Sequence, residues 1–465
     1  MRKVLRQLIC LGLALCFCAC ETFEIIERPE KDTSGDKYGF ERVYNSGEIP
    51  EIHITVPLDQ WNTLLANFDQ NAKTKQYASC DVKYTDSNGS VSVKGAGLRL
   101  RGNTSRRRPE DSPQHVAGET VWHHCHFSLN LDKYTKDAAH KIRGMKKMHL
   151  KWFKDDPNYV REVYCYDLFH RFGIWSAPHS TYCRLWLKVS GDKDEAYFGV
   201  YELLEPIDTR FVKARTEGGF GKAEGNLWKC RWGATLNSTR ADFGIDDGSD
   251  AEHTYEFKSD DNDFNAAKEQ LQDFILKLTG KGEDSFYAWI QEVCDVPLLL
   301  KTYAVNVTVG MWDDYWMNKN NYYIYFNTTD KYDYKFYFIP FDYDNTLGTS
   351  LMMDAGRQDP LNWGDNSNLL IYRLLQFDDF RQIYKDALLK LVGENEGLFY
   401  YTASMQRIKD WQDKIRPYVP NDTGEDCEIY DAPAPWGNKP EYLIQTTGPN
   451  NFFQVKTQTI EKYCK

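Results

Sequence analysis

The sequence predicts an α+β fold, because strand patterns fill its first half and helical patterns fill its second half. From residue 49 to about residue 201, short apolar segments alternate with polar residues and are separated by turn residues. In the second half, apolar residues recur at the spacing of one helix face, and a hairpin pattern at 322–339 interrupts them. Strands first and helices later are typical of α+β architecture, here with two lobes.

Several segments of the first half have the length and the alternation of strands. One pair of them flanks Asn88-Gly89, a dipeptide that favours a tight hairpin turn. The expected strands are 49–56, 80–84, 91–93, 97–100, 127–131, 147–152, 181–189 and 197–201.

Helical spacing of apolar residues occurs twice among these strands and then dominates the second half. Asp155 or Asp156 is the expected cap of one early helix, and Asp295 with Pro297 marks the start of a later one. The expected helices are 58–68, 157–172, 265–278, 285–293, 297–309, 369–391 and 403–418. We expect residues 242–262 to form a polar surface excursion, and the chain beyond the last helix to be irregular.

Two acidic clusters lie at the outer ends of the predicted hairpin, whose strands are 322–326 and 336–339. A hairpin returns to the side where it began, so it brings the two clusters together. Each cluster contributes two carboxylates: Asp313, Asp314, Asp342 and Asp344. Carboxylates this close do not all stay ionised without a cation, and oxygen ligands suit Mg²⁺, Mn²⁺ or Ca²⁺ rather than zinc. The alternative is that aspartates at strand ends are solvated turn formers.

The order of residues within the clusters favours the metal site. Asp342 and Asp344 alternate with aromatic residues, so both carboxylates face one side of an extended chain. An amide oxygen from the segment between the clusters joins them, and it comes from Asn318, Asn320 or Asn321.

Composition limits the classes of protein that need considering. A chain of 465 residues is long enough for one large domain or two interlocked lobes. Its net charge of −11 and the lack of a long basic run argue against a nucleic-acid partner. Aromatic residues make up 15% of the chain, which fits either a robust core or a carbohydrate-facing surface.

The chain begins with a basic head and an apolar run at 8–18, which is the pattern of an export signal. The run is too short for a bilayer-spanning helix, which needs about 20 apolar residues. Ala19-Cys20 resembles the junction of a bacterial lipoprotein signal, so we expect a signal peptide at 1–19, a lipidated Cys20 and a tether at 20–37. An ordinary secretory signal cut nearby is the alternative. The expected location is the cell envelope, periplasmic or at the cell surface, with the membrane reached through the lipid.

Eight further cysteines follow, and none of them forms a close C-x-x-C pair, so a zinc ribbon is not expected. In an exported protein, some cysteines are expected to form disulfides. Cys427 and Cys464, near the end of the chain, are the favoured pair.

One motif carries a specific family resemblance. Residues 101–106 are Arg-Gly-Asn-Thr-Ser-Arg, which resembles the R-G-N-S-S-R motif of the spore coat protein H (CotH) kinase-like family. Other segments are similar to that family in the same order: Arg161-Glu162, 197–208, 226–229 and 339–348. The resemblance spans roughly residues 49–391.

This resemblance implies an atypical protein kinase-like fold with two lobes around one active site. The expected lobes are a strand-rich one at 38–235 and a helical one at 236–465, which together form one domain. Active members of the family transfer phosphate from ATP to a serine of a protein and use a divalent metal, here Mg²⁺ or Mn²⁺. The protein substrate of this chain does not follow from its sequence.

The resemblance also implies roles for the acidic clusters. Asp342, with Asp344 as a second candidate, takes the place of the metal-holding Asp of a kinase Asp-Phe-Gly motif. Asp313 or Asp314 is the base that accepts the proton of the substrate hydroxyl.

The second metal ligand stays open among three asparagines. In a kinase catalytic loop, an Asn follows the catalytic Asp after five residues, a spacing that Asp313 and Asn318 meet. Asn321 stands directly before the strand, where the Asn of the family is expected, and Asn320 is its neighbour.

The candidate residues for binding the ATP phosphates lie in one turn and in two alternative lysine–glutamate pairs. Arg101, Asn103 and Ser105 form a turn whose guanidinium and small residues suit phosphate oxygens. The alternative for this turn is an arginine-rich structure paired with surface acids.

Two lysine–glutamate pairs are candidates for positioning the phosphates. Lys151 lies on a predicted strand just before the helix that carries Glu162. The alternative is Lys229 with Glu202 or Glu205. Because a strand lysine near a helix glutamate is frequent on protein surfaces, sequence alone does not decide between a site and surface decoration.

Two other functions compete with the kinase hypothesis. The first is a non-catalytic surface lipoprotein that keeps a kinase-like scaffold and binds glycans or proteins through its aromatic residues. The second is metal-dependent hydrolysis of a glycan or phosphoester by the same carboxylates.

Overall fold

The structure is a computed structural model that describes residues 43–44, 47–135, 141–259, 261–327, 333–437 and 441–465. The predicted signal peptide at 1–19, the tether at 20–37 and the lipidated Cys20 lie outside these residues. Among the described helices, none combines the length and the apolar character that a membrane crossing requires. The mixed helix and strand content is consistent with the predicted α+β class.

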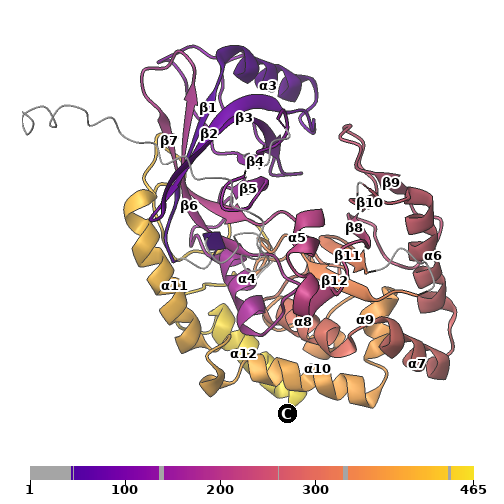
Figure 1. The fold of residues 1–465 in the computed structure, drawn as a ribbon. Helices are drawn as coiled ribbons and strands as arrows, with labels where there is room; N and C mark the ends of the chain where they lie inside the picture. The colour runs from indigo at the N-terminus through magenta and orange to yellow at the C-terminus, as the bar shows by residue number, and fades with distance from the viewer. Residues whose placement is uncertain (1–42, 45–46, 136–140, 260, 328–332, 438–440) are drawn as a thin grey trace, which may run out of the picture.

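A closed barrel of seven strands forms the first part of the chain (Figure 1). Its strands follow the order β1-β2-β3-β4-β5-β7-β6, and β1 closes the barrel by pairing in parallel with β6. Neighbours are otherwise antiparallel. The strands are β1 (Glu51–Val56), β2 (Ala78–Asp86), β3 (Gly89–Arg101), β4 (His126–Asn130), β5 (Lys147–Lys151), β6 (Ser180–Val189) and β7 (Ala196–Leu204).

The barrel closes because its strands alternate as the sequence predicts. In β1, for example, Ile52, Ile54 and Val56 are fully buried while the residues between them are not. The Asn88-Gly89 turn joins β2 to β3 as expected, but the predicted strands 91–93 and 97–100 are one long strand. Gly95 interrupts the apolar alternation without ending the strand, and its positive φ of 68° marks an irregular point.

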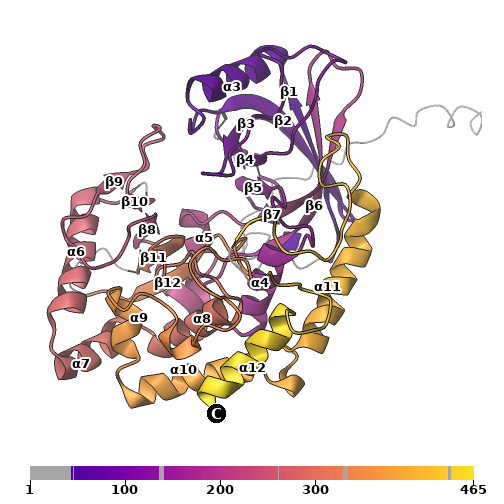
Figure 2. The ribbon, with the colours of Figure 1, turned by 180° about the vertical axis from the view of Figure 1, so that it is seen from behind.

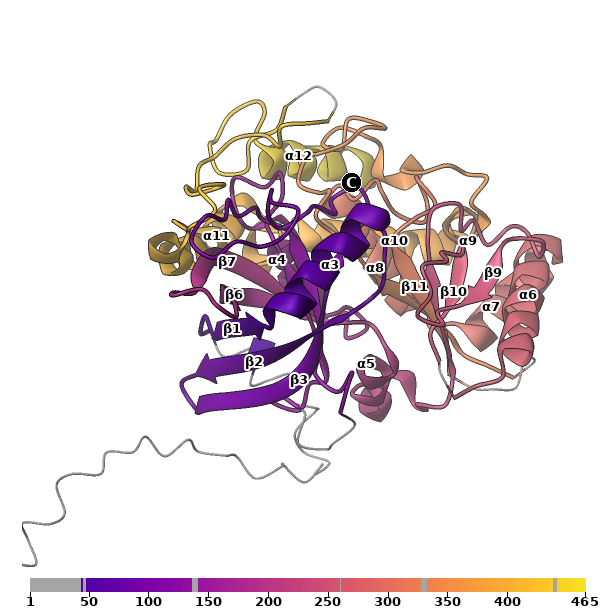
Figure 3. The ribbon, with the colours of Figure 1, turned by 90° about the horizontal axis from the view of Figure 1, so that it is seen from above.

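Helix α3 (Leu58–Gln70) lies across the barrel, as Figure 3 shows from above. It buries Trp61, whose indole nitrogen donates to the carboxylate of Glu110 in the loop between β3 and β4 (3.3 Å). Glu110 also contacts His115, whose Nδ1 lies 2.8 Å from it, and the other ring nitrogen lies 3.0 Å from Asp192. A buried histidine between two carboxylates therefore holds helix, loop and barrel together.

We expect His115→Gln to lower the free energy of unfolding by about 2 kcal/mol at pH 6 and by less at pH 9. Burial acts to lower the pKa of His115, but the hydrogen bonds from Glu110 and Asp192 outweigh it and raise that pKa above its ordinary value. The stability gained is complete below about pH 6.5 and is lost as pH rises through the folded pKa. Urea unfolding across this range measures it, with His253→Gln as the more exposed control. Parallel pH profiles for His115→Gln and wild type would contradict the prediction.

A second, five-stranded sheet follows, in the order β12-β11-β8-β10-β9. The predicted hairpin is confirmed as β11 (Tyr322–Phe326) and β12 (Phe336–Pro340). Its other strands are β8 (Asn226–Cys230), β9 (Phe243–Ile245) and β10 (Tyr255–Phe257). The prediction of a surface excursion at 242–262 was wrong for β10, since Tyr255 and Phe257 are buried, whereas Ile245 of β9 is 47% exposed. Acidic residues around these short strands mask their alternation.

Helices pack around this second sheet and form the lower half of the molecule (Figures 1 and 2). The predicted helix 369–391 is two helices, broken after Leu374, and the predicted irregular tail contains a helix whose apolar face is buried. The helices are α4 (Arg161–Arg171), α5 (Thr209–Lys213), α6 (Phe264–Gly280), α7 (Glu283–Val293), α8 (Val296–Thr308), α9 (Leu369–Leu374), α10 (Asp378–Leu391), α11 (Tyr401–Ile415) and α12 (Phe452–Cys464).

Helix α4 joins the two parts, because it packs against β6 of the barrel and against α8. It begins at Arg161, later than predicted, and the carboxylate of Asp156 accepts the backbone nitrogens of Val160 and Arg161 (both 2.8 Å). This start places Glu162 in the first turn of the helix.

The predicted pairing of Cys427 with Cys464 is wrong. All the cysteines of the described part of the chain are free, and Cys464 is buried in the packing of α12. Cys427 instead lies near Asn421, whose amide nitrogen is 3.6 Å from its sulfur.

Candidate functional site

A cleft of about 1150 Å³ lies between the barrel and the second sheet. Strands β3, β4 and β5 supply one wall, and β8, β10 and β11 supply the other. The predicted site residues that line it are Arg101, Asn103, Ser105, Lys151, Lys229, Asp313, Asn321, Asp342 and Asp344, together with Asn320.

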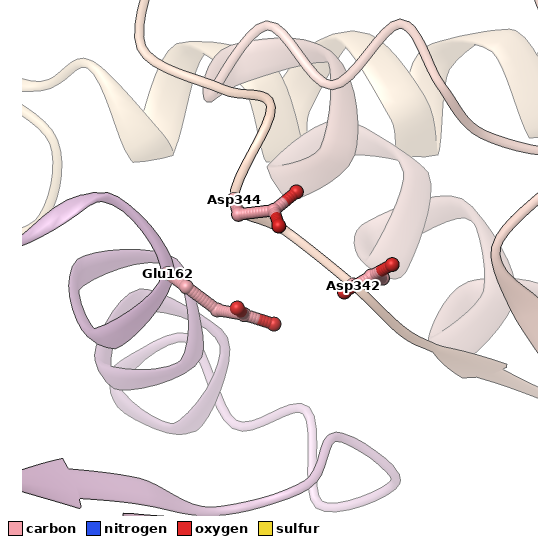
Figure 4. A group of neighbouring side chains, drawn as sticks. All are labelled: Glu162, Asp342 and Asp344. Carbon is pink, nitrogen blue, oxygen red and sulfur yellow. The ribbon is translucent and has the colours of Figure 1, made fainter. Parts of the chain in front are cut away.

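At the base of this cleft, one buried lysine contacts three carboxylates. Lys151, the last residue of β5, is 4% exposed, and its ammonium group contacts Glu162 of α4. The same nitrogen lies 2.8 Å from Asp342 Oδ1 and 3.5 Å from Asp344 Oδ2. One oxygen from each of the three carboxylates lies within 4.8 Å of the others. Figure 4 shows Glu162 reaching from its helix toward the two aspartates.

The chain just after β12 presents both aspartates to Lys151. Phe341 and Tyr343 are buried, and the aspartates that alternate with them keep 32% and 41% of their side chains exposed. Asp342 has a positive φ of 64°, a conformation that costs a non-glycine residue energy and is found at functional sites. Its backbone nitrogen donates to the hydroxyl of Tyr166, and that of Tyr343 donates to Glu162 (3.1 and 3.2 Å).

When its three carboxylates are all ionised, the cluster carries more negative charge than Lys151 neutralises. Burial raises the pKa of Glu162 to about 8 and that of Asp344 to about 8. Burial also acts to raise the pKa of Asp342, but the charge of Lys151 outweighs it and lowers that pKa to about 2. A divalent cation at the two aspartates would supply the missing positive charge. Carboxylate oxygens suit Mg²⁺ or Mn²⁺, so the residues fit the metal that the sequence predicts.

Asp313 faces the cleft inside a cage of asparagine amides. Its Oδ1 accepts from Asn318 Nδ2 (2.6 Å) and Asn320 Nδ2 (3.1 Å), and its Oδ2 accepts from Asn321 Nδ2 (2.9 Å). Left-handed backbone at Lys319 and Asn321 wraps this loop around the carboxylate. Burial raises the pKa of Asp313, and the amides oppose that effect. Because the amide nitrogens are occupied, the amide oxygens are the atoms left for a metal. Asn320 and Asn321 line the cleft, whereas Asn318, the other predicted ligand, does not.

Asp314 points the other way, into the core. It is 3% exposed and does not line the cleft. Its oxygens accept from Asn306 Nδ2 (2.7 Å) and from the backbone nitrogen of Met317 (2.8 Å). Of the two candidate bases, the structure brings only Asp313 to the cleft.

Some arginines at the end of β3 and in the turn after it form ion pairs with surface acids, and another lines the cleft. Arg107 pairs with Glu425 (2.8 Å) and Arg108 with Asp69 (2.9 Å), as the alternative interpretation predicts. Arg101 is different, since its Nη1 is buried without a hydrogen-bond partner in the described part of the chain. Gly102 is needed for the turn, because its φ is +109° and a Cβ there would lie 3.0 Å from the backbone nitrogen of Arg106.

The alternative lysine pair does not form. Lys229 lies over the rings of Phe341 and Tyr323, 5.2 and 6.0 Å from their centres, and burial holds its pKa well below the ordinary value. Glu205 pairs instead with Arg215 (2.6 Å). Glu202 accepts from the Ser180 hydroxyl (2.7 Å), and it pairs in register with Lys151.

Comparison with known families decides the membership of this chain. The family model described as CotH kinase protein matches residues 98–446. The chain belongs to the CotH kinase family. No curated protein matches it. Membership suggests a kinase-like phosphotransferase that uses ATP and a divalent metal.

The CotH match confirms the resemblance found in the sequence and places it on the structure. It begins within β3, three residues before Arg101, and runs past α11 into the chain before α12. The matched span contains every residue of the cleft base and of the Asp313 loop.

Sequence reasoning missed some residues that shape this site. Tyr166 holds the backbone of Asp342, and Asn306 holds Asp314. Asn306 stands among apolar neighbours in α8, and this is the one signal that could have pointed to the second of these. Nothing in the sequence marked Asp250, whose carboxylate accepts from Asn71 (2.8 Å) and from the backbone of Lys75 (2.7 Å) and so joins the barrel to the β9–β10 connection.

Proposed function

We propose that this chain is a protein kinase-like phosphotransferase that uses ATP and Mg²⁺ or Mn²⁺ to phosphorylate a serine of an exported protein. One observation carries the proposal: Lys151 joins Glu162 to Asp342 and Asp344 in a cleft that also contains Asp313. In a kinase, the lysine–glutamate pair and the metal-holding aspartate must be in place together. The barrel would then be the N-terminal lobe, and the second sheet with its helices the C-terminal lobe.

The cleft residues divide the work of phosphoryl transfer. Lys151 and the unpartnered guanidinium of Arg101 would bind phosphate oxygens, with Lys229 on the facing wall. Asp342 and Asp344 would hold the metal, and the amide oxygen of Asn321 would help to hold a second one. When bound, the metal neutralises the charge that develops on the transferred phosphoryl group.

Asp313 would act as the base. It orients the serine hydroxyl and accepts its proton while the serine oxygen bonds to the γ-phosphorus and the bond from that phosphorus to ADP breaks. Three amides fix its carboxylate, and this cage keeps Asp313 in one position. Such preorganisation lowers the cost of aligning donor and acceptor.

The cleft rim carries exposed apolar side chains that a polypeptide acceptor would contact. Leu351 is 55% exposed and lines the cleft, and its neighbour Met352 is 52% exposed. Two exposed aromatic residues, Trp232 (71%) and Tyr134 (51%), also line the cleft, so the glycan-binding alternative keeps a surface on which sugars could stack. A branched aliphatic side chain at the rim suits an apolar side chain of a peptide.

The proposal includes export and lipid anchoring, which the signal-like pattern of the N-terminus and Cys20 support. The acceptor would therefore be another protein of the cell envelope. The reaction would then take place outside the main ATP pool of the cell, so the test adds ATP directly to the purified protein.

The test uses residues 38–465, purified and mixed with ATP, Mg²⁺ or Mn²⁺ and a degenerate serine peptide library. We expect metal and ATP together to raise the melting temperature and serine phosphate to be found by mass spectrometry. A shift without transfer would favour a non-catalytic scaffold. If neither a rise in melting temperature nor phosphate transfer is observed, the proposal is contradicted.

We expect Leu351→Asp to raise KM for the preferred peptide about tenfold and to leave KM for ATP unchanged. Burying a leucine side chain is worth about 1.5–3 kcal/mol, and 1.4 kcal/mol corresponds to a factor of ten. Leu276→Asp is the matched control, since Leu276 is 60% exposed on α6 and does not line the cleft. Equal KM values for the two variants would contradict a role of Leu351 in acceptor binding.

A further inference from the structure

A buried path of side chains connects the Asp313 loop with the Asp342–Asp344 loop. Asn306 of α8 donates from Nδ2 to Asp314 Oδ2 (2.7 Å), and the hydroxyl of Tyr343 donates to Asn306 Oδ1 (2.7 Å). Asp314 adjoins Asp313 in the chain, and Tyr343 stands between the two metal aspartates. The path therefore ends beside the proposed base on one side and beside the proposed metal ligands on the other.

The same path continues to the lysine pair. The backbone nitrogen of Tyr343 donates to Glu162 Oε1 (3.2 Å), and Glu162 contacts the ammonium group of Lys151. Glu162 Oε1 also accepts from the hydroxyl of Tyr166 (3.3 Å). One set of contacts thus spans α8, the loop after β12, α4 and β5.

The side chains of this path are buried, which restricts them to one arrangement. Asn306 and Asp314 are each 3% exposed, and Tyr343 is 2% exposed. Each side-chain polar atom of Asn306 has a partner, because Nδ2 donates to Asp314 and Oδ1 accepts from Tyr343. A fully satisfied polar network in a region of low dielectric holds its members in one arrangement.

We propose that Tyr343 and Asn306 are positioning residues that fix the proposed base Asp313 relative to the metal aspartates. The inference rests on the proposed function, because it assigns the two loops to one reaction. Neither residue lines the cleft, so both act through their neighbours. A small displacement of reacting groups costs up to about a hundredfold in rate.

The first test removes one hydroxyl. Tyr343→Phe keeps the ring, which packs edge-on against Phe169 with centres 5.0 Å apart, and deletes the bond to Asn306. We expect kcat to fall about 10- to 100-fold while KM for ATP changes less than threefold.

The matched control is Tyr164→Phe. Tyr164 is also fully buried, and its hydroxyl contacts Ser404 (2.7 Å) and Arg407 (3.1 Å) rather than the site. We expect a similar drop in melting temperature in both variants but an unchanged kcat in the control. If kcat falls equally in both, the path is ordinary core structure and the inference is overturned.

The second test exchanges donor and acceptor. Asn306→Asp places a carboxylate opposite Asp314, and we expect it to lower kcat at least as much as Tyr343→Phe. Adding Asp314→Asn restores a donor opposite an acceptor and leaves an oxygen to accept from Met317. It gives up only the longer bond from Asn306 Nδ2 to the Met311 carbonyl (3.3 Å), so we expect kcat to recover to within about fivefold of wild type.

The outcomes separate this inference from the proposed function. Active wild type with no recovery in the Asn306→Asp/Asp314→Asn variant, although it folds with the wild-type melting temperature, would overturn the inference alone. Wild type that transfers no phosphate would overturn both.

Discussion

Asp342→Asn is expected to lower phosphoryl transfer about a thousandfold and to leave the fold intact. The substitution keeps the shape of the side chain but removes the charge that would hold the metal, and metal stabilisation of the transferred group is worth several kcal/mol. Stability should fall only modestly, because the variant loses the ion pair of Asp342 with Lys151 (2.8 Å) but is relieved of the repulsion between Asp342 and its neighbours Glu162 and Asp344. Steady-state transfer and calorimetric unfolding measure the two effects.

Asp378→Asn is the control for this substitution. Asp378 lies in the first turn of α10 with a fully exposed side chain, so its charge is screened by water and salt. We expect full activity from this control. An Asp342→Asn variant that keeps a tenth of wild-type activity, or one that unfolds, would contradict the assignment of Asp342 as metal ligand.

Local pattern explains which parts of the fold were predictable. The hairpin of β11 and β12 was found from sequence because alternation and a polar turn lie within 19 consecutive residues, from Tyr322 to Pro340. Its pairing with β8 was not found, since β8 lies about a hundred residues earlier and has only five residues. The parallel pairing of β1 with β6 was missed for the same reason.

Within the site, the limit was the direction of each side chain. Asp313 and Asp314 are adjacent and chemically identical in sequence, but one is caged by asparagines at the cleft and the other is held by Asn306 in the core. Tertiary contacts with α8 decide this, and no local pattern reports them. Lys151 and Glu162 were predictable as candidates because a strand end and a helix start are local features.

Lys151→Met is expected to destabilise the metal-free protein by about 3 kcal/mol at pH 8.5 and by less at pH 6. Without the ammonium group, Glu162, Asp342 and Asp344 lose their only contacting counter-charge among the described residues, and the more distant Arg101 and Lys229 remain. Burial already raises the pKa of Glu162 and of Asp344 to about 8 in the wild type. Where folded carboxylates bind protons more tightly than unfolded ones, stability falls as pH rises through the folded pKa. Removing the lysine raises the folded-state pKa values further, so stability falls over a wider range of pH.

Added Mn²⁺ should then restore part of the lost stability, because a divalent cation replaces the missing positive charge and binds the folded state only. Urea unfolding of wild type and Lys151→Met at both pH values, with and without Mn²⁺, measures this. Lys83→Met, which removes an exposed lysine from β2, is the control and should show neither effect. If Mn²⁺ stabilised the control as much as Lys151→Met, or if the loss were equal at both pH values, the three carboxylates would not form a cation site. If Mn²⁺ rescues Lys151→Met, a divalent cation can neutralise the same carboxylates that Lys151 neutralises in the wild type.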